Sequence, residues 1–333
     1  MANIEMKIEG LPTGFTLRRP TMDDLAAVKQ LVNLCEVAEY GKAETTEDDM
    51  RLWWQRPNFD LATDAWLVFA PDGQVVADAN VGHQQHVRIY AEVDVHPAYQ
   101  HRGIGTHLLR LAEERAREHV PSAPDGARVV LISRMNSVNE AGQQLLEKHG
   151  FTLIRNFWRM GIELQETPPI AQWAEGLSVR TLAPGMERVV YEADEEIFQD
   201  HWGFISATFE QWSHWSLKGE HFDPSLWFLA MEGEEIAAIA LCADEKESGG
   251  WVHVLGVRRP WRRKGVGLAL LHHAFGEFYR RNIHNVYLGV DAQSLTGATR
   301  LYERAGMHVV RQSKNYEKEL RAGKELSTQS VAV

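Results

Sequence analysis

Cysteine is scarce in this chain of 333 residues, which contains only Cys35 and Cys242. Two thiols about two hundred residues apart do not form a disulfide framework, and they are too few for a cysteine-based zinc site. No run of about eighteen apolar residues is present, which excludes a membrane span. The first ten residues mix charges with short apolar stretches and lack the apolar core of a signal peptide. We therefore expect a reducing, cytoplasmic location.

Positive charge is also in deficit, since 35 Lys and Arg face 46 Asp and Glu and the formal net charge is −11. Such a surface repels phosphate backbones, so nucleic acid is not an expected partner. Local amides and one Arg cluster can still bind an anionic cofactor. Four histidines lie close in sequence, but they have no cysteine or carboxylate pattern at ligand spacing, so we expect solvated histidines and no metal; they are His83, His86, His96 and His101.

The sequence repeats itself. Residues 93–105 and 255–267 share an apolar strand, a turn with a proline, a basic residue and Gly-x-Gly, and each is followed by an apolar-periodic helix. Further landmarks recur in the same order, with 162 residues between the members of the first two pairs and 156 in the third: Arg18 and Arg180, Gly103 and Gly265, Gly150 and Gly306. This order indicates a tandem duplication.

The duplication predicts two domains, over residues 11–165 and 176–320, joined by a linker that contains Thr167-Pro168-Pro169. Prolines in that position continue neither a helix nor a central strand. The polar tail, residues 321–333, is expected to be mobile. Within each half an antiparallel meander leads into a strand–helix–strand–helix unit. The expected fold class is therefore α/β, with an α+β mixed sheet in each domain.

The Gly-x-Gly segments carry the chemistry. Each lies between a strand and a helix, where the first helical amides lack intrahelical partners and carry the positive end of the helix dipole. Glycine lets a phosphate approach those amides closely, and Gln100 or Arg262 is placed to brace the loop. The dinucleotide-binding fingerprint fails in both halves, because its third glycine is replaced by Leu108 and Leu270.

These segments match the acetyl-CoA-binding motif of the GNAT N-acetyltransferase superfamily, Gln/Arg-x-x-Gly-x-Gly/Ala, at residues 100–105 and 262–267. Each half then resembles the terminal signature of the family, at residues 145–151 and 301–307. The resemblance covers nearly the whole chain. It implies two tandem GNAT domains, in an arrangement similar to mycothiol synthase-like proteins.

The resemblance implies that acetyl-CoA is the cofactor. Loop and helix amides would bind its pyrophosphate, while the strand before each loop would pair with the pantetheine arm and polarise the thioester carbonyl. In the first half the implied residues are Val93, Val95, Gln100, Arg102, Gly103, Ile104, Gly105 and Thr106. In the second half they are Leu255, Val257, Arg262, Arg263, Lys264, Gly265, Val266, Gly267 and Leu268.

The two halves diverge at the implied catalytic positions. The family's tyrosine, which protonates the departing thiolate, corresponds to Tyr302 in the second half and to Leu146 in the first. The second half is therefore the better candidate for catalysis. The carboxylate that mycothiol synthase-like sequences place before the loop is replaced by Trp251, and we take His253 as the substitute general base. Glu92 is an alternative in the first half, and water-mediated deprotonation is another.

The leading hypothesis is direct transfer of an acetyl group from acetyl-CoA to a primary amine within a ternary complex. A second domain beside the cleft would restrict access, so a small-molecule acceptor is favoured over a protein. A catalytically silent CoA-binding regulator or scaffold is the main alternative, and a longer acyl chain or a hydroxyl acceptor is another. The segment Asp200-His201-Trp202-Gly203 either lines an acceptor site or packs against a neighbouring domain. A monomer or a weak homodimer is expected.

Overall fold

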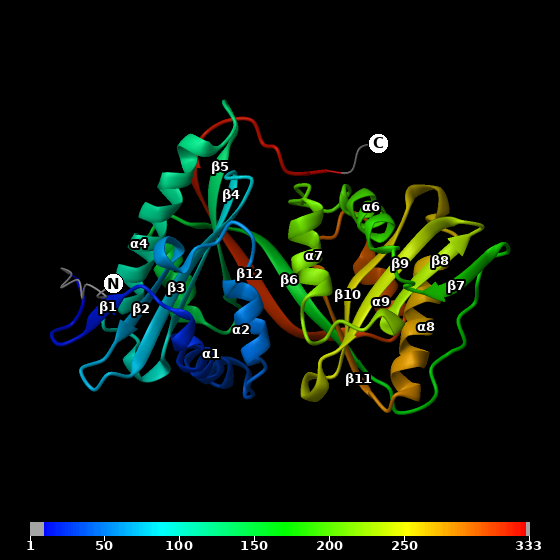
Figure 1. Ribbon diagram of the computed structural model, residues 1–333, viewed down its shortest axis with the longest axis horizontal. Coiled ribbons are helices and arrows are strands. Elements are labelled where there is room, and N and C mark those ends of the chain that lie inside the picture. Colours follow the sequence, from blue (N-terminus) through cyan, green and yellow to red (C-terminus); the bar gives the residue numbers. More distant parts are fainter. Residues whose placement is uncertain (1–9, 331–333) are drawn as a thin grey trace. The chain divides into compact units, whose positions relative to one another are not determined.

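The computed structural model describes residues 10–330, which form two compact units (Figure 1). Unit 1 contains residues 10–154 and 313–326, and unit 2 contains residues 155–312 and 327–330. Each unit thus takes its last strand from the other half of the sequence. The domain ranges expected from the repeat, 11–165 and 176–320, treat each half as continuous. They differ from these units because residues 155–165 belong to unit 2 and residues 313–320 belong to unit 1.

Unit 1 has a mixed sheet in the order β1-β2-β3-β4-β5-β12. All neighbouring strands are antiparallel except β4 and β5. Its strands are β1 (Thr16–Arg18), β2 (Ala65–Phe69), β3 (Val75–Gln84), β4 (Arg88–Val95), β5 (Val129–Asn136) and the part of β12 (His308–Arg321) from Ser313 on. Its helices are α1 (Leu25–Tyr40), α2 (Glu47–Trp54), α3 (Leu61–Asp64), α4 (Ile104–His119) and α5 (Glu140–Lys148).

Unit 2 repeats this plan, with the order β6-β11-β10-β9-β8-β7 and one parallel pair, β10 with β11. Its strands are β7 (Leu177–Thr181), β8 (Trp227–Glu232), β9 (Glu235–Asp244), β10 (Gly250–Val257), β11 (Asn285–Asp291) and the part of β6 (Thr152–Glu163) from Arg155 on. Its helices are α6 (Glu187–Phe198), α7 (Phe209–Leu217), α8 (Val266–Arg280) and α9 (Ala298–Arg304).

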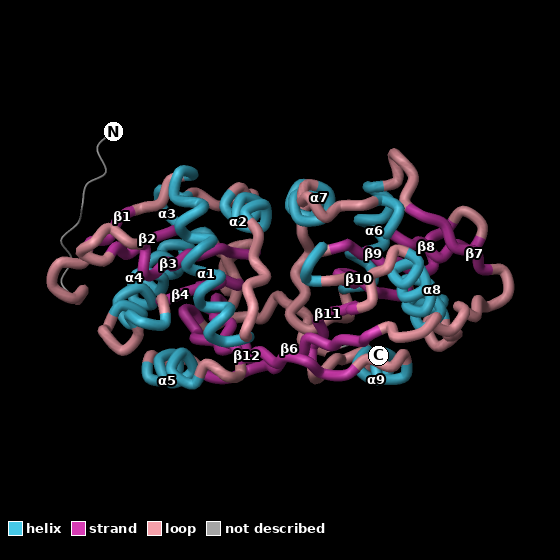
Figure 2. The backbone as a smooth tube through the Cα atoms, turned by 90° about the horizontal axis from the view of Figure 1, so that it is seen from below, coloured by secondary structure: helices cyan, strands magenta, loops and turns pink. Residues whose placement is uncertain are grey.

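Helices cover both faces of the sheet in unit 2, and Figure 2 shows α6 and α8 on opposite sides of its strands. Along β8, Phe228 and Ala230 pack toward α8, whereas Trp227 and Leu229 pack in the cluster formed with α6 and α7. Because both faces are covered, the strand is a continuous apolar run rather than an alternating one.

The chain beyond β12 is hydrogen-bonded as far as Gln329. In unit 1 the amide of Lys324 donates to the carbonyl of Gly126, at 2.7 Å. In unit 2 the amide of Gly203 donates to the carbonyl of Thr328, also at 2.7 Å. Residues 324–329 thus make hydrogen bonds, residues 331–333 lie outside the described part, and the mobility of the tail over residues 321–333 stays a prediction. In residues 10–330 no helix combines the length and the apolar character needed to cross a membrane.

Candidate active site

Both units turn from strand to helix through the same backbone conformation. In unit 1 the φ angles of His101 and Gly103 are 60° and 83°, and in unit 2 those of Arg263 and Gly265 are 62° and 79°. Two left-handed residues in alternation bend the chain sharply before the helix begins. Glycine adopts this conformation without strain, which explains the first glycine of each motif.

The loop and the first helical turn together present free amide donors. The first helical hydrogen bond of α4 runs from the amide of His107 to the carbonyl of Gly103, and that of α8 from Ala269 to Gly265, each at 3.0 Å. Three amides precede each of these bonds and have no partner within the helix. They belong to Ile104, Gly105 and Thr106 in unit 1 and to Val266, Gly267 and Leu268 in unit 2. Each set forms an anion cradle at the positive end of its helix.

The second glycine of each motif has a packing role. A Cβ on Gly105 would lie 3.4 Å from Leu145 Cδ2 and 3.5 Å from a methyl of Val95. A Cβ on Gly267 would lie 3.2 Å from Leu301 Cδ2 and 3.4 Å from a methyl of Val257. In each unit this glycine therefore lets the helix approach both the preceding strand and the terminal helix closely.

The predicted brace residues do bind the strand ends. Gln100 Nε2 donates to the carbonyl of Val95 at 3.4 Å, and Arg262 Nε donates to the carbonyl of Val257 at 2.9 Å. The stronger brace is in unit 2, because it is shorter and its donor is charged.

Next to each cradle the two parallel strands separate. The pairing of β4 with β5 covers Arg88–Tyr90, and that of β10 with β11 covers residues 250–252. The later part of each first strand keeps its hydrogen bonds to the antiparallel neighbour alone. One backbone edge thus stays open over residues 91–95 and 253–257. These edges include the residues implied to pair with a pantetheine arm, Val93, Val95, Leu255 and Val257.

In unit 1 the open edge borders a cavity of about 310 Å³. Its walls come from α1, β4, the cradle loop, the end of β5 and α5. Polar groups on it include Glu39, Asp94 and Asn139, and Asn139 Nδ2 donates to Glu39 Oε1 at 2.6 Å. The cavity also contacts Leu146, the residue at the position of the family's tyrosine. The position of the family's tyrosine therefore carries no phenol in unit 1, although Tyr99 also lines the cavity.

Three carboxylates lie on the β3–β4 pair beside this cavity. Asp94 is directly opposite Asp78 in the strand register, and Glu92 is opposite Asn80, whose Nδ2 donates to it at 3.2 Å. Burial raises the pKa of Asp94 to about 7, and the charges of Glu92 and Glu39 add to the effect. Burial also raises the pKa of Asp78 and Glu92. A carboxyl that titrates near neutral pH is suited to accept a proton from an amine.

The same place in unit 2 is apolar. Gly256 stands where unit 1 has Asp94, 162 positions earlier, and it lies opposite Ile239 in the register. The side chain of Ile197 fills the space, since a Cβ on Gly256 would come within 2.1 Å of its Cγ2. The residue that corresponds to Ile197 in unit 1 is the smaller Cys35, which lines the cavity.

His253 lies in a β-bulge of β10. The register with β9 shifts between Val252 and Val254, and these two residues pack in different cores, on the α8 side and the α6 side. The His253 side chain is half exposed, and its Nε2 lies 3.0 Å from Glu245 Oε1. Trp251 lies beside it, with 5.9 Å between the ring centroids. A histidine paired with a carboxylate is a reasonable proton acceptor, but its catalytic role remains a prediction.

Tyr302 is buried in the α8-side core with Trp261, Val266 and Met307. Burial raises the pKa of its hydroxyl to about 12, so the group keeps its proton at neutral pH. That is the state an acid needs before it protonates a thiolate, although a pKa this high makes it a weak acid.

Asp200 organises the cradle of unit 2. Its side chain is buried, and it accepts hydrogen bonds from Arg259 Nη2 at 2.6 Å and from Arg262 Nη1. These two bonds lower the pKa of Asp200 to about 2, with Arg259 contributing most. Unit 1 has Ala38 at the equivalent position, and Ala38 lines the cavity there. Asp200, the first residue of the segment expected to line an acceptor site or to pack against a neighbouring domain, supports the brace, and both alternatives for the segment stay predictions.

Some of these residues were missed by reasoning from the sequence alone. Asp78 and Asp94 are charged residues in strands that otherwise read as apolar, and an acid on an inward face was the available signal. The opposition of Gly256 to Ile197 had no sequence signal, because it depends on how a helix crosses a strand.

Comparison with known proteins agrees with the duplicated architecture. The profile described as Acetyltransferase (GNAT) family matches residues 25–151 and 188–307. The chain is 38% identical to the GCN5-related N-acetyltransferase from Sphaerobacter thermophilus, covering 96% of this chain and 100% of that one with a TM-score of 0.81. It is also similar to two proteins named mycothiol acetyltransferase. That from Saccharopolyspora erythraea is 25% identical over 65% of this chain and 72% of its own length. That from Catenulispora acidiphila is 25% identical over 87% and 94%.

Proposed function

The chain belongs to the GNAT acetyltransferase family, and on that premise we propose that it transfers the acetyl group of acetyl-CoA to the primary amine of a small molecule. The observation that carries the proposal is the arrangement found twice in the chain, in which an open amide cradle lies next to a strand edge free of pairing. Diphosphate and pantetheine amides are the groups that such a pair of features binds.

Acetyl-CoA supplies an activated acetyl thioester. The loop amides hold its phosphates, and the open edges of β4 or β10 supply donors that stabilise negative charge as it develops on the thioester oxygen. The amine attacks the carbonyl carbon directly, a C–N bond forms, the C–S bond breaks, and the thiolate receives a proton. No nucleophilic Cys or Ser is required in this scheme.

We assign the thiolate's acid to Tyr302, whose hydroxyl is protonated at neutral pH. The proton lost by the amine is assigned to the His253–Glu245 pair. This places the reaction in unit 2.

Unit 1 supports a second assignment of the same chemistry. Its cavity holds Asp94, whose pKa is raised to about 7 by burial, together with Glu39. These carboxylates favour a cationic amine and provide a base, whereas Leu146 provides no acid. Release of the thiolate there would depend on water or on Tyr99, which also lines the cavity.

The first experiment is isothermal titration calorimetry of the full chain with acetyl-CoA, repeated on Thr106→Glu and Leu268→Glu. Both residues sit in the third position of their helices, where a carboxylate is compatible with the helix but repels a bound phosphate. The matched controls are Thr106→Gln and Leu268→Gln. We expect each Glu variant to weaken its own site by roughly tenfold or more, which corresponds to about 1.4 kcal/mol.

A panel of small amines, assayed by thiol release, then tests turnover. Binding without turnover for any amine favours the silent CoA-binding alternative. Faster release with a longer acyl-CoA or a hydroxyl acceptor favours the third alternative. If the chain does not bind acetyl-CoA, the proposal is wrong and only the fold is shared.

A further inference from the structure

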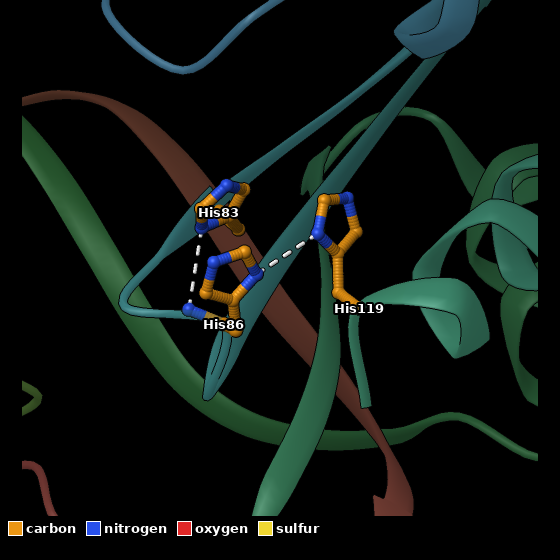
Figure 3. Close-up of side chains that lie close together, drawn as sticks. All are labelled: His83, His86 and His119. Carbon is orange, nitrogen blue, oxygen red and sulfur yellow. Dashed lines mark hydrogen bonds between the residues drawn. The ribbon is translucent and has the colours of Figure 1, made fainter. Parts of the chain in front are cut away.

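Three histidines from separate parts of unit 1 converge at one place (Figure 3). His83 is near the end of β3, His86 lies in the turn between β3 and β4, and His119 is the last residue of α4. One ring nitrogen of each lies within 4.8 Å of the other two. Among residues 10–330, these three side chains form the one group of His, Cys, Asp or Glu residues whose ligand atoms are close enough together to hold a metal ion. From the sequence, His83 and His86 are expected to be solvated and no metal is expected, because His119, the third member of the group, lies 33 residues beyond His86.

One pair of ring nitrogens is almost at the spacing that a metal ion imposes, and a ring nitrogen of His83 lies within 4.8 Å of both. His86 Nδ1 lies 3.0 Å from His119 Nδ1, and the His83 ring stacks on that of His86 with 3.9 Å between centroids. Two nitrogens bound to one tetrahedral Zn²⁺ at 2.0–2.1 Å are roughly 3.3 Å apart. The distance between His86 Nδ1 and His119 Nδ1 therefore has to increase by only a few tenths of an ångström for both atoms to bind one ion.

The electrostatic state of the cluster suits a cation. Burial, and then the neighbouring imidazoles, lower the pKa of His83 to about 4, and burial lowers the pKa of His86 and His119. Each ring is neutral at physiological pH and has one unprotonated nitrogen; in His83 this is Nδ1, which accepts a hydrogen bond from the backbone amide of His86 at 3.2 Å. Arg115, whose charge acts on all three histidines, is paired with Asp64 at 2.7 Å and with Glu118 at 2.6 Å. A metal ion would therefore not face an unpaired positive charge from Arg115.

Two further observations suggest that the protein alone does not satisfy this cluster. His119 Nε2 is buried and has no hydrogen-bond partner among the described residues. The turn that carries His86 is strained, since Gln85 and His86 have φ angles of 48° and 58°. Such turns favour Asn and Gly, so a Gln-His pair there is costly and directs the imidazole of His86 back over His83.

We propose that His83, His86 and His119 bind a transition-metal ion of the Zn²⁺ class, with the fourth coordination position open to water. Neutral imidazole is a preferred ligand for Zn²⁺, and three protein nitrogens with one open position is a known arrangement for this ion. The ion would tie the β3–β4 turn to the C-terminal end of α4. Since α4 has 16 residues, the ion lies about 24 Å from the cradle at the other end of that helix.

The site is distinct from the acetyl-CoA cradle, so its expected effect is on stability rather than on chemistry. The ion closes a loop between two elements that otherwise meet through side-chain packing. We therefore expect the thermal transition of unit 1 to move upward with added Zn²⁺, and that of unit 2 to stay where it is.

The test is metal titration of the chelator-stripped full chain, with Zn²⁺ by calorimetry and with Co²⁺ by visible absorption. The key variant is His86→Gly, because glycine accepts the left-handed φ and so removes a ligand while relieving strain. Gln85→Gly is the matched control, since it relieves the same turn and keeps all three ligands. His308→Asn, an exposed histidine on β12, controls for adventitious surface binding.

We expect one Zn²⁺ per chain, and a tetrahedral Co²⁺ spectrum, in the parent protein, Gln85→Gly and His308→Asn. His86→Gly and His119→Asn should bind at least about 100-fold more weakly, since loss of a mere supporting residue already costs 10- to 100-fold. Equal binding by His86→Gly and Gln85→Gly would overturn the proposal, as would the absence of saturable binding. Folding of each variant is checked by circular dichroism, and a variant that is folded but metal-free supports the site.

Discussion

Units 1 and 2 have the same cradle conformation, but the strand next to the cradle carries acidic residues in unit 1 and apolar residues at the equivalent positions in unit 2. Their loops agree within a few degrees in φ at equivalent residues, and each loop is braced to the end of its strand. On the strand before the loop, unit 1 has Asp94, which lines a cavity together with Cys35. At the equivalent place in unit 2, the side chain of Ile197 occupies the space next to Gly256. The backbone conformation of the loop is thus shared by both copies, while the residues proposed as acid and base differ between them.

The comparison teaches that a shared motif does not identify the reactive copy. Unit 1 has a carboxylate with a raised pKa and a leucine at the acid position, and unit 2 has a tyrosine and an apolar floor. The experiments below test which of these differences matters, starting with the largest expected effect.

Replacing the unit 2 acid should have the largest effect. For Tyr302→Phe we expect kcat to fall by about 10²- to 10⁴-fold, the usual contribution of a general acid, with the affinity for acetyl-CoA unchanged because the ring stays in the core. The measurement is steady-state thiol release together with calorimetry. Tyr287→Phe, on β11 of the same unit, is the control. Full activity in Tyr302→Phe, combined with loss of activity in Asp94→Asn, would move the reaction to unit 1.

Introducing one methyl group at Gly256 should destabilise unit 2. The Cβ of Gly256→Ala would lie 2.1 Å from Ile197 Cγ2, and overpacking of this kind costs about 1–3 kcal/mol. Adding Ile197→Cys, the unit 1 residue, should recover most of this loss. Calorimetric unfolding of the two single variants and the double variant measures the coupling.

The control for that series is Gly276→Ala, in the interior of α8. A Cβ there meets nothing within 4 Å, so this substitution should stabilise the protein by about 0.5–1 kcal/mol. Additive effects of Gly256→Ala and Ile197→Cys would show that the two residues do not compete for one space.

Removing the charge of Asp200 should loosen the unit 2 brace. Asp200→Asn keeps the shape but weakens the bonds to Arg259 and Arg262, and we expect a loss of about 1–2 kcal/mol at neutral pH. The pKa of Asp200 is about 2, below its ordinary value of 3.8, so its stabilisation is present above pH 4 and is lost as the pH falls toward 2.

The difference between the parent protein and Asp200→Asn should therefore shrink in acid, as measured by urea unfolding at several pH values. Weaker binding of acetyl-CoA to unit 2, with unit 1 unaffected, is expected in parallel. A stability difference that does not change from pH 7 to pH 2 contradicts the assignment.

Neutralising Asp94 should change stability in the opposite direction. Its pKa is about 7 in the folded protein against an ordinary 3.8, so the fold favours the protonated form. The stabilisation from this group is complete below about pH 4 and is lost as the pH rises to 7. Asp94→Asn should therefore be more stable than the parent by at least about 1 kcal/mol at pH 8, since raising a pKa by one unit corresponds to about 1.4 kcal/mol, and show no gain at pH 4.

Urea unfolding at the two pH values measures this change, with Asp72→Asn in the exposed β2–β3 turn as the control. A gain in stability that is equal at pH 4 and pH 8 would mean that the Asp94 carboxyl has an ordinary pKa.

Much of the local structure was predictable from the sequence. The two Gly-x-Gly motifs lie between a strand and a helix as expected, and the apolar-periodic helices predicted after them are α4, Ile104–His119, and α8, Val266–Arg280. The braces by Gln100 and Arg262 are also confirmed. These features depend on residues close in sequence, whose backbone preferences and periodicity decide the result.

Other features could not be predicted because they depend on contacts between distant segments. The exchange of β6 and β12 between the units joins strands that lie far apart in the chain. The opposition of Asp78 to Asp94 is set by strand register, and the convergence of His119 on His83 and His86 is set by the length of α4.

By itself, the sequence determined that the chain is a duplicated acetyltransferase fold with two anion cradles, because glycine spacing and hydrophobic period are local properties. Only the tertiary structure decided that burial raises the pKa of Asp94, that the side chain of Ile197 packs against Gly256, and that three histidines lie close together. Those outcomes depend on desolvation and on distances between side chains, and both arise only when the strands and helices pack together.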